Sequence, residues 1–113
     1  MQVKTIVALL GLTGAIAFSP MASALDADAA QALGKKEGCF KCHALDKKKE
    51  AKSIKEIAKK YAGKPDAEAK ILHHMTAGEK VKMEDGTEED HKVIKTKDKA
   101  EIKNLIEWIL SVK

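Results

Sequence analysis

The sequence predicts an all-α domain, for three reasons. Apolar residues recur at helical spacing in several segments, start and stop signals bound those segments, and no segment alternates convincingly as a β-strand. The chain has 113 residues, and its beginning has the pattern of an export signal. We therefore expect one small helical domain, of a size that often needs a cofactor, metal or cross-link for stability.

The N-terminus has the features of a cleaved signal peptide. Lys4 gives a basic start, an uncharged apolar run follows from 6 to 18, and Ala22-Ser23-Ala24 fits the small-residue cleavage pattern. The apolar run is too short for a good membrane span. We expect residues 1–24 to be removed and residues 25–113 to form the exported domain, with an uncleaved, anchored N-terminus as the alternative.

The first two helices are predicted from the residues at their ends. The first runs from about Asp26 or Asp28 to Glu37, because acidic residues favour a first turn and Gly38 favours a stop. The second is the stretch SIKEIAKKYAG. Its Ser53 forms a capping box with the glutamate that follows, and its glycine ends the helix.

Two further helices flank a long polar segment. The third helix is PDAEAKILHHMTAG, between Pro65 and Gly78. The fourth is DKAEIKNLIEWILSVK, with Asp98 as its cap and an apolar stripe of helical period formed by Ile102, Leu105, Ile106, Ile109 and Leu110. Residues 79–97 lie between them and show no periodicity, so we expect one long irregular loop of the kind that often serves function.

Charge is distributed unevenly along the chain. All basic residues other than histidine are lysines, and the formal net charge is +4. The absence of arginine argues against nucleic-acid binding, because arginine forks read phosphates and guanine edges. Residues 35–64 carry a net charge of +7, and residues 79–90 carry a net charge of −4. This segregation favours electrostatic steering of transient protein partners.

The segment EGCFKCHAL carries the strongest chemical signal. Cys39 and Cys42 are the two cysteines of the chain, and His43 follows at once. This spacing suits covalent haem attachment, in which both thiols form thioethers and the histidine binds the iron from the same side. The rival interpretations are a redox-active or disulfide-bonded pair and half of a zinc site.

The rest of the sequence weighs against both rivals. A zinc site needs four ligands, and His73 and His74 make a poor second pair because adjacent helical side chains diverge by about 100°. A thioredoxin-like pair needs a βαβ context, which is missing. We therefore expect one covalent haem c, held by Cys39 and Cys42, with His43 as the proximal iron ligand.

Three segments resemble the small class I monohaem c-type cytochromes of bacterial periplasms. GCFKCHALD is similar to the attachment segment, SIKEIAKKYAG followed by DAEAKI to the middle helices, and LIEWILSVK to the terminal helix. The resemblance implies a class I cytochrome c fold, in which about four helices wrap around one haem and the N- and C-terminal helices cross. It also implies single-electron transfer by a carrier that is not an enzyme and has no catalytic residues.

The resemblance also implies a second iron ligand in the loop before the last helix. In the family it is usually a methionine, roughly sixteen residues before the tryptophan of that helix. His91 lies seventeen residues before Trp108, and Met83 lies twenty-five before it. We expect His91 to be the distal ligand, with Met83 as the alternative. A His43/His91 pair should lower the reduction potential relative to methionine-ligated relatives.

The remaining histidines and methionines have simpler expected roles. Met75 should belong to the core, and His73 and His74 should lie on the surface of their helix. The alternative for His74 is a contact with a haem propionate or ligation of the iron. The acidic residues beside His91 should favour its protonated form, which would weaken iron binding at acid pH.

Two positions depart from the family pattern. Ala51-Lys52 stands where the family commonly has Gly-Pro, so we expect the carbonyl of Lys52 to accept the N–H of the proximal imidazole. Gly34 stands where an aromatic residue often packs against the terminal helix. We expect Trp108 to approach the first helix there or to fill the gap itself.

These features predict a monomeric periplasmic electron carrier of a respiratory chain. The expected partners are redox proteins, such as periplasmic or membrane cytochromes, an oxidase or a reductase, docked transiently by charge. No nucleic-acid partner is expected. The alternative is a small haem peroxidase or a gas-ligand sensor with a labile sixth coordination position. The missing arginine and the short chain argue against a peroxidase.

Overall fold

The computed structural model describes residues 11, 14–15 and 24–113. The predicted signal peptide therefore lies almost entirely outside the described residues, and its removal stays a prediction. Within those residues, no helix has the length and apolar character needed to cross a membrane.

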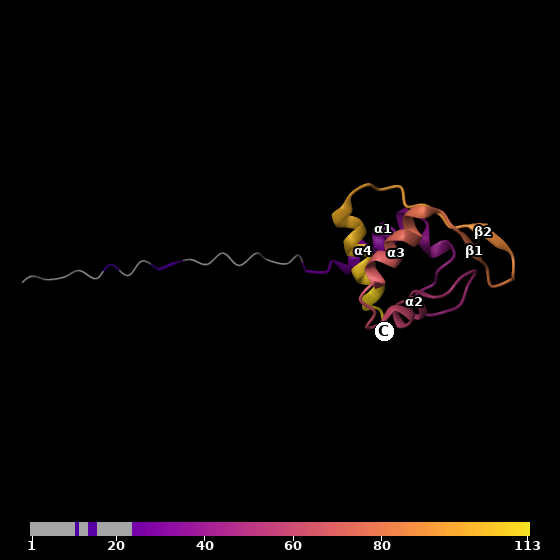
Figure 1. Cartoon of the computed structure of the whole chain (residues 1–113), viewed down its shortest axis with the longest axis horizontal. Helices are drawn as coiled ribbons and strands as arrows, with labels where there is room; N and C mark the ends of the chain where they lie inside the picture. The colour runs from indigo at the N-terminus through magenta and orange to yellow at the C-terminus, as the bar shows by residue number, and fades with distance from the viewer. Residues whose placement is uncertain (1–10, 12–13, 16–23) are drawn as a thin grey trace, which may run out of the picture.

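The domain is built from four helices, a short 3₁₀ turn and a small hairpin (Figure 1). In chain order, these are α1 (Ala27–Lys36), η1 (Cys39–Lys41), α2 (Ile54–Tyr61), α3 (Ala67–Ala77), β1 (Lys80–Lys82), β2 (Glu88–Asp90) and α4 (Lys99–Ser111). The predicted caps Ser53 and Asp98 hold, because their side chains accept N–H groups at the starts of α2 and α4. Helix α1 is capped by Asp26, one of the two residues predicted for its start. Gly78 ends α3 in the left-handed conformation, as its position predicts.

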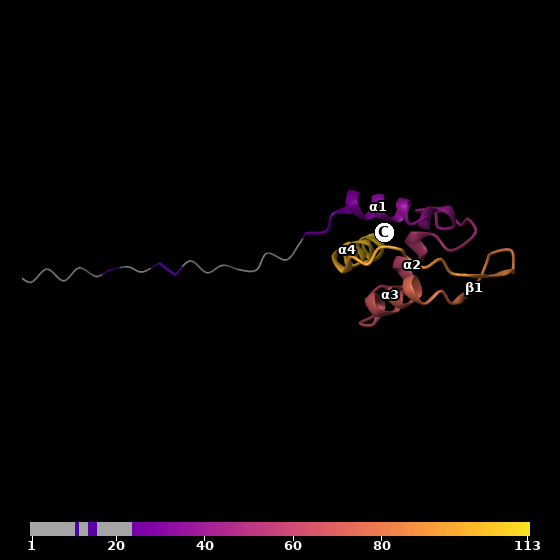
Figure 2. The same ribbon diagram turned by 90° about the horizontal axis from the view of Figure 1, so that it is seen from above.

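The core lies mainly between α1, α4 and the inner faces of α2 and α3. Helices α1 and α4 lie side by side in both views (Figures 1 and 2). Ala30 of α1 and Leu105 and Ile106 of α4 are the most deeply buried apolar side chains, each about 1% exposed. The core is completed by Leu33, Ile54, Ile71, Met75, Ile94, Ile102, Trp108 and Ile109.

Phe40 fills the space beside Gly34, so the second of the two arrangements expected for Trp108, in which it fills that space itself, is wrong. A Cβ atom on Gly34 would lie only 2.9 Å from Cζ of Phe40, which shows that the ring occupies the room that a side chain on α1 would need. Trp108 instead packs edge-to-face against Phe40, with ring centroids 6.0 Å apart. This contact joins the segment after α1 to helix α4.

The predicted irregular loop contains a short antiparallel hairpin. Strands β1 and β2 pair Lys80 with Asp90 and Lys82 with Glu88, and they project at one end of the molecule (Figure 1). Gly86 makes the turn with a positive φ of 87°. The hairpin has no apolar alternation because its strands are largely exposed and pair opposite charges, so the pattern that reveals strands is missing. The all-α fold class is otherwise confirmed.

Candidate functional site

A cavity of about 650 Å³ opens between the 3₁₀ turn, α2, α3 and the hairpin. This volume is in the range of cofactor pockets. All five residues predicted to serve the haem line it, and the structure therefore brings together Cys39, Cys42, His43, Met83 and His91. His74 of α3 also lines it.

The attachment segment is a tight turn that directly follows α1. Gly38 leaves the helix in the left-handed conformation with φ of 79°, and the N–H groups of Cys42 and His43 both donate to the carbonyl of Cys39. This turn gathers the two cysteines and the histidine at the same edge of the cavity. The local sequence determines it, because glycine adopts a positive φ at little cost.

The two cysteines do not have the properties of a redox pair. Burial raises the pKa of the Cys39 thiol. Burial, followed by the neighbouring Glu50 carboxylate, raises the pKa of Cys42. Reactive cysteines need a lowered pKa, because the thiolate is the nucleophile. The raised pKa values therefore do not favour exchange chemistry at these two thiols.

The backbone fixes the orientation of His43. Its Nδ1–H donates to the carbonyl of Lys52 at 2.6 Å, as the sequence predicts. This contact fixes the tautomer and leaves Nε2 free to bind a metal. Lys52 directly precedes Ser53, whose buried hydroxyl caps α2 by accepting the N–H of Glu56 at 3.1 Å. The helix start therefore holds the carbonyl in place.

His91 faces His43 across the cavity. Their ring centroids are 6.3 Å apart, with a 48° angle between the planes. Two imidazoles that bind one metal through nitrogens at about 2 Å place their ring centres about 6 Å apart. Within the described residues, Nδ1 of His91 is the one buried side-chain polar atom without a hydrogen-bond partner. A buried ring nitrogen without a hydrogen-bond partner is expected where the side chain binds a metal or a cofactor.

Burial lowers the pKa of His91, so the expectation that nearby acids favour its protonated form is wrong. The imidazoles of His74 and His43 act in the same direction. Glu88, Glu89 and Asp90 are exposed on the hairpin, where water screens their charges. The neutral imidazole, which is the metal-binding form, is therefore favoured at this position.

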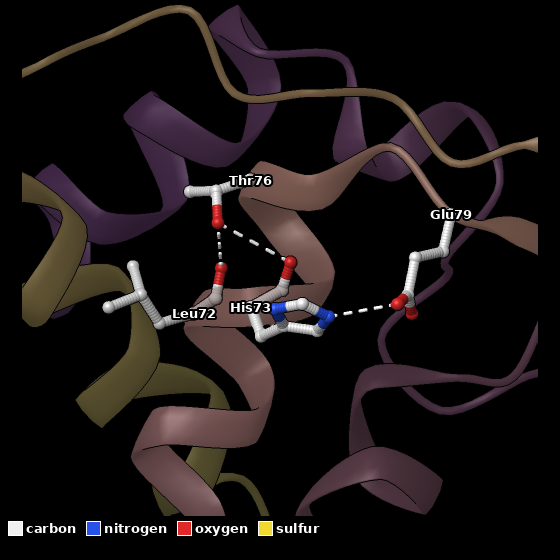
Figure 3. Close-up of polar contacts among 4 residues, drawn as sticks. All are labelled: Leu72, His73, Thr76 and Glu79. Carbon is white, nitrogen blue, oxygen red and sulfur yellow. Dashed lines mark hydrogen bonds and ion pairs between the residues drawn. The ribbon is translucent and has the colours of Figure 1, made fainter.

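His74 lies in the cavity, contrary to the expectation that it lies on the helix surface. Its ring centroid is 4.0 Å from that of His91. The signal was present in the sequence, because His74 lies three residues after the core residue Ile71 and therefore on the same side of the helix. Its neighbour His73 is exposed, as predicted, and its Nε2 lies 2.9 Å from the Glu79 carboxylate (Figure 3).

The two methionines differ in their surroundings. Met75 is a core residue, as predicted, and is about 9% exposed. Met83 sits at the end of the hairpin, where its N–H donates to the carbonyl of Thr87 and its carbonyl accepts the N–H of Gly86. Both side chains line the cavity. The position of Met83 is thus fixed by an exposed turn, whereas His91 follows the hairpin at its inner end.

The donor set does not fit a zinc site. In the part of the chain that the structure describes, no three histidine, cysteine, aspartate or glutamate side chains are grouped so that they could hold a metal ion by themselves. Two thiols on one edge and one imidazole on each side of a wide cavity instead fit a planar cofactor that brings its own metal ligands.

The sequence matches the cytochrome c family over residues 27–113. The chain belongs to this family. It therefore carries one covalently bound haem c with its iron, and it is an electron carrier and not an enzyme. The predicted resemblance to small class I c-type cytochromes is confirmed.

Individual relatives support the same assignment. The class 1 cytochrome MtoD of Sideroxydans lithotrophicus ES-1 is 54% identical, with a TM-score of 0.75 over 79% of this chain and 98% of that one. Cytochrome c552 of Nitrosomonas europaea is 32% identical, with a TM-score of 0.59 over 78% of this chain and all of the other. Cytochrome c-552 of Hydrogenobacter thermophilus is 34% identical, over 96% of this chain and 95% of its own length.

We expect Ser53→Ala to lower the free energy of unfolding by about 1 kcal/mol, because the N-terminus of α2 loses its cap. Urea denaturation of the haem protein measures this loss. Thr76→Ala is a matched control, since this exposed hydroxyl donates to carbonyls within α3 and caps no helix (Figure 3). The control should change stability by less than about 0.5 kcal/mol. Equal losses would show that the cap of α2 has no special importance.

Proposed function

We propose that this cytochrome is a periplasmic one-electron carrier whose haem iron is bound by two imidazoles, those of His43 and His91. The observation that carries the proposal is the 6.3 Å separation of these rings across the cavity that also contains Cys39 and Cys42. When bound, the haem supplies the one-electron change between ferric and ferrous iron.

Each residue has a distinct role in this proposal. Cys39 and Cys42 hold the haem covalently through thioethers. His43 binds the iron on the proximal side, oriented by the carbonyl of Lys52. His91 binds the iron on the distal side. The backbone N–H of His91 donates to the carbonyl of Glu79 at 2.8 Å, and this contact fixes the position of the His91 backbone. With both axial positions filled by protein, the iron has no open site for bond chemistry.

Met83 is the alternative distal ligand and has weaker support. Both side chains are half-buried, but His91 has the unpartnered ring nitrogen described above, whereas the backbone of Met83 is hydrogen-bonded within the turn of the hairpin. A bis-imidazole haem should have a lower reduction potential than a methionine-ligated one, because the thioether favours ferrous iron.

The ferric protein should give a low-spin spectrum without the far-red methionine-to-iron band, because both axial ligands are imidazoles. His91→Ala should become high-spin, whereas the matched control Met83→Leu should keep the wild-type spectrum. Absorption and electron paramagnetic resonance spectra of the three proteins make this comparison.

Two results would contradict the ligand assignment. One is a far-red band that persists in His91→Ala, which would identify a methionine as the ligand. The other is a His91→Ala protein that stays low-spin without that band, which would direct attention to His74, the third imidazole of the cavity.

Positive charge surrounds the mouth of the cavity. We define the cavity rim as the five exposed lysines that line it, Lys41, Lys52, Lys60, Lys82 and Lys92. The exposed carboxylates on the same lining are fewer, namely those of Glu84, Glu89 and Asp90. We infer that the protein docks transiently, as a monomer, on redox partners with an acidic surface.

The lysine-rich segment 35–64 and the hairpin of β1 and β2 contact each other. The N–H of Glu84 donates to the carbonyl of Glu50 at 3.1 Å, and the Glu84 carboxylate lies 4.0 Å from the amino group of Lys48. The charges that the sequence separates therefore meet at the tip of the hairpin. The rim lysines, rather than two separate charged faces, support docking of a partner near the haem.

Lys41→Glu/Lys60→Glu should slow electron transfer to a small anionic iron complex about threefold to tenfold at low ionic strength, because attraction at the rim is lost. Lys99→Glu/Lys103→Glu makes the same change in net charge on α4, away from the cavity, and should have a smaller effect. Stopped-flow rates measure both variants. Equal slowing would show that net charge, rather than the rim, governs the encounter.

Contacts of Asp26 with α4 support the proposed cleavage after Ala24. Asp26, two residues after the proposed cleavage site, exchanges two hydrogen bonds with Asn104 of α4 through its N–H and carbonyl, at 3.0 and 2.8 Å. A chain that starts at Leu25 would therefore retain the first tertiary contacts of the domain.

Protein purified from the periplasm should start at Leu25 and carry one haem bound through two thioethers, so its intact mass should equal that chain plus one haem. No free thiol should react with an alkylating reagent. Cys42→Ser serves as the control and should lose one thioether. A colourless product with reactive cysteines would contradict the assignment of both thiols.

A further inference from the structure

Glu37 is a buried carboxylate at the end of α1. It is about 5% exposed and lines the haem cavity. It makes no ion pair within the described residues, although buried glutamates usually need a charged or hydrogen-bonded partner. Its position at the C-terminal end of a helix is also unfavourable for a negative charge. Burial without an ion pair and a position at a helix C-terminus both disfavour a carboxylate here, so its hydrogen-bond partners need to be identified.

The hydrogen-bond partners of Glu37 are backbone N–H groups in the segment before α4, far from Glu37 in the sequence. Its two carboxylate oxygens accept from the N–H of Lys95 at 2.7 Å and from the N–H of Thr96 at 3.2 Å. These residues follow the proposed distal ligand. Both oxygens act as acceptors, which suits a carboxylate and not an amide. Glu37 therefore ties α1, which leads into the haem attachment turn, to the segment that carries His91.

Two other contacts hold the same segment. The N–H of His91 donates to the carbonyl of Glu79, and the N–H of Ile94 donates to the carbonyl of Met75 at 2.9 Å. Both of these contacts are between backbone groups and lie near α3. Glu37 adds the link to α1, so residues 91–96 are held from both sides of the cavity.

The charge of Glu37 acts on the attachment site. Its field is one of the causes that raise the pKa of the Cys39 thiol, after burial. Lys92 acts on the pKa of Cys39 in the opposite direction, and its amino group lies beside Gly38. That side chain is exposed, so water screens its charge. The buried carboxylate is screened less, so its field should dominate inside the cavity.

We propose that Glu37 is a positioning residue that anchors segment 91–96 against α1 and, through its buried negative charge, lowers the reduction potential of the haem. The effect on potential follows because reduction adds an electron near a fixed negative charge, which favours ferric iron. The inference rests on the bound haem, but it does not require His91 to be the ligand.

Glu37→Gln removes the charge and leaves one of the two N–H groups without an acceptor. We expect it to shift the ferric–ferrous equilibrium towards ferrous iron by about tenfold, which is 59 mV for one electron. Glu101→Gln is the matched control. The Glu101 carboxylate also accepts a hydrogen bond from Thr96, in this case from the Thr96 hydroxyl, but Glu101 is exposed. Potentiometric titration of both haem proteins gives the comparison. A shift in Glu37→Gln no larger than that of the control would overturn the proposal.

Amide hydrogen exchange of the unmodified haem protein tests the anchor even if the variant does not accumulate. The N–H groups of Lys95 and Thr96 should exchange more slowly than those of Lys92 and Val93, which have no hydrogen-bond partner within the described residues. Equally fast exchange of all four would overturn the anchoring role. Neither measurement depends on which side chain binds the iron, so failure here is distinguishable from failure of the ligand assignment.

Discussion

The packing of α1 against α4 is the contact on which the rest of the structure depends. Ala30, Leu105 and Ile106 are almost fully buried in it, and Asn104 ties the beginning of the domain to the same helix. Helix α1 runs directly into the attachment turn, and Phe40 of that turn packs against Trp108. In a domain with so few aromatic residues, this packing sets where the cysteines and His43 lie relative to the remaining helices.

The cavity is held mainly by backbone groups. A carbonyl orients His43, backbone contacts to Glu79 and Met75 fix the segment that begins at His91, and a side chain of α1 completes that set. Backbone positions of this kind move little when a charge changes, because the helices behind them are packed. A preorganised site of this sort suits a carrier, whose iron must change charge without rearranging its surroundings.

The positive and negative charges around the cavity differ in their burial. The rim lysines are exposed, where their charges act over a distance on an approaching protein but are screened by salt. The carboxylate of Glu37 is buried, where its field acts on the cofactor with less screening. The proposed encounter therefore depends mainly on the exposed rim lysines, and the proposed effect on the reduction potential depends mainly on the buried Glu37.

The sequence by itself determined the features that arise from neighbouring residues: the caps of α2 and α4, the glycine stops, and the Cys39–His43 turn. It also predicted the Lys52 carbonyl contact, through the family pattern. Only the tertiary structure decided that Phe40 fills the space at Gly34 and that Glu37 binds Lys95 and Thr96. Local signals depend on residues a few positions apart, whereas these contacts join segments whose separation along the chain leaves no periodic trace, and only packing brings them together.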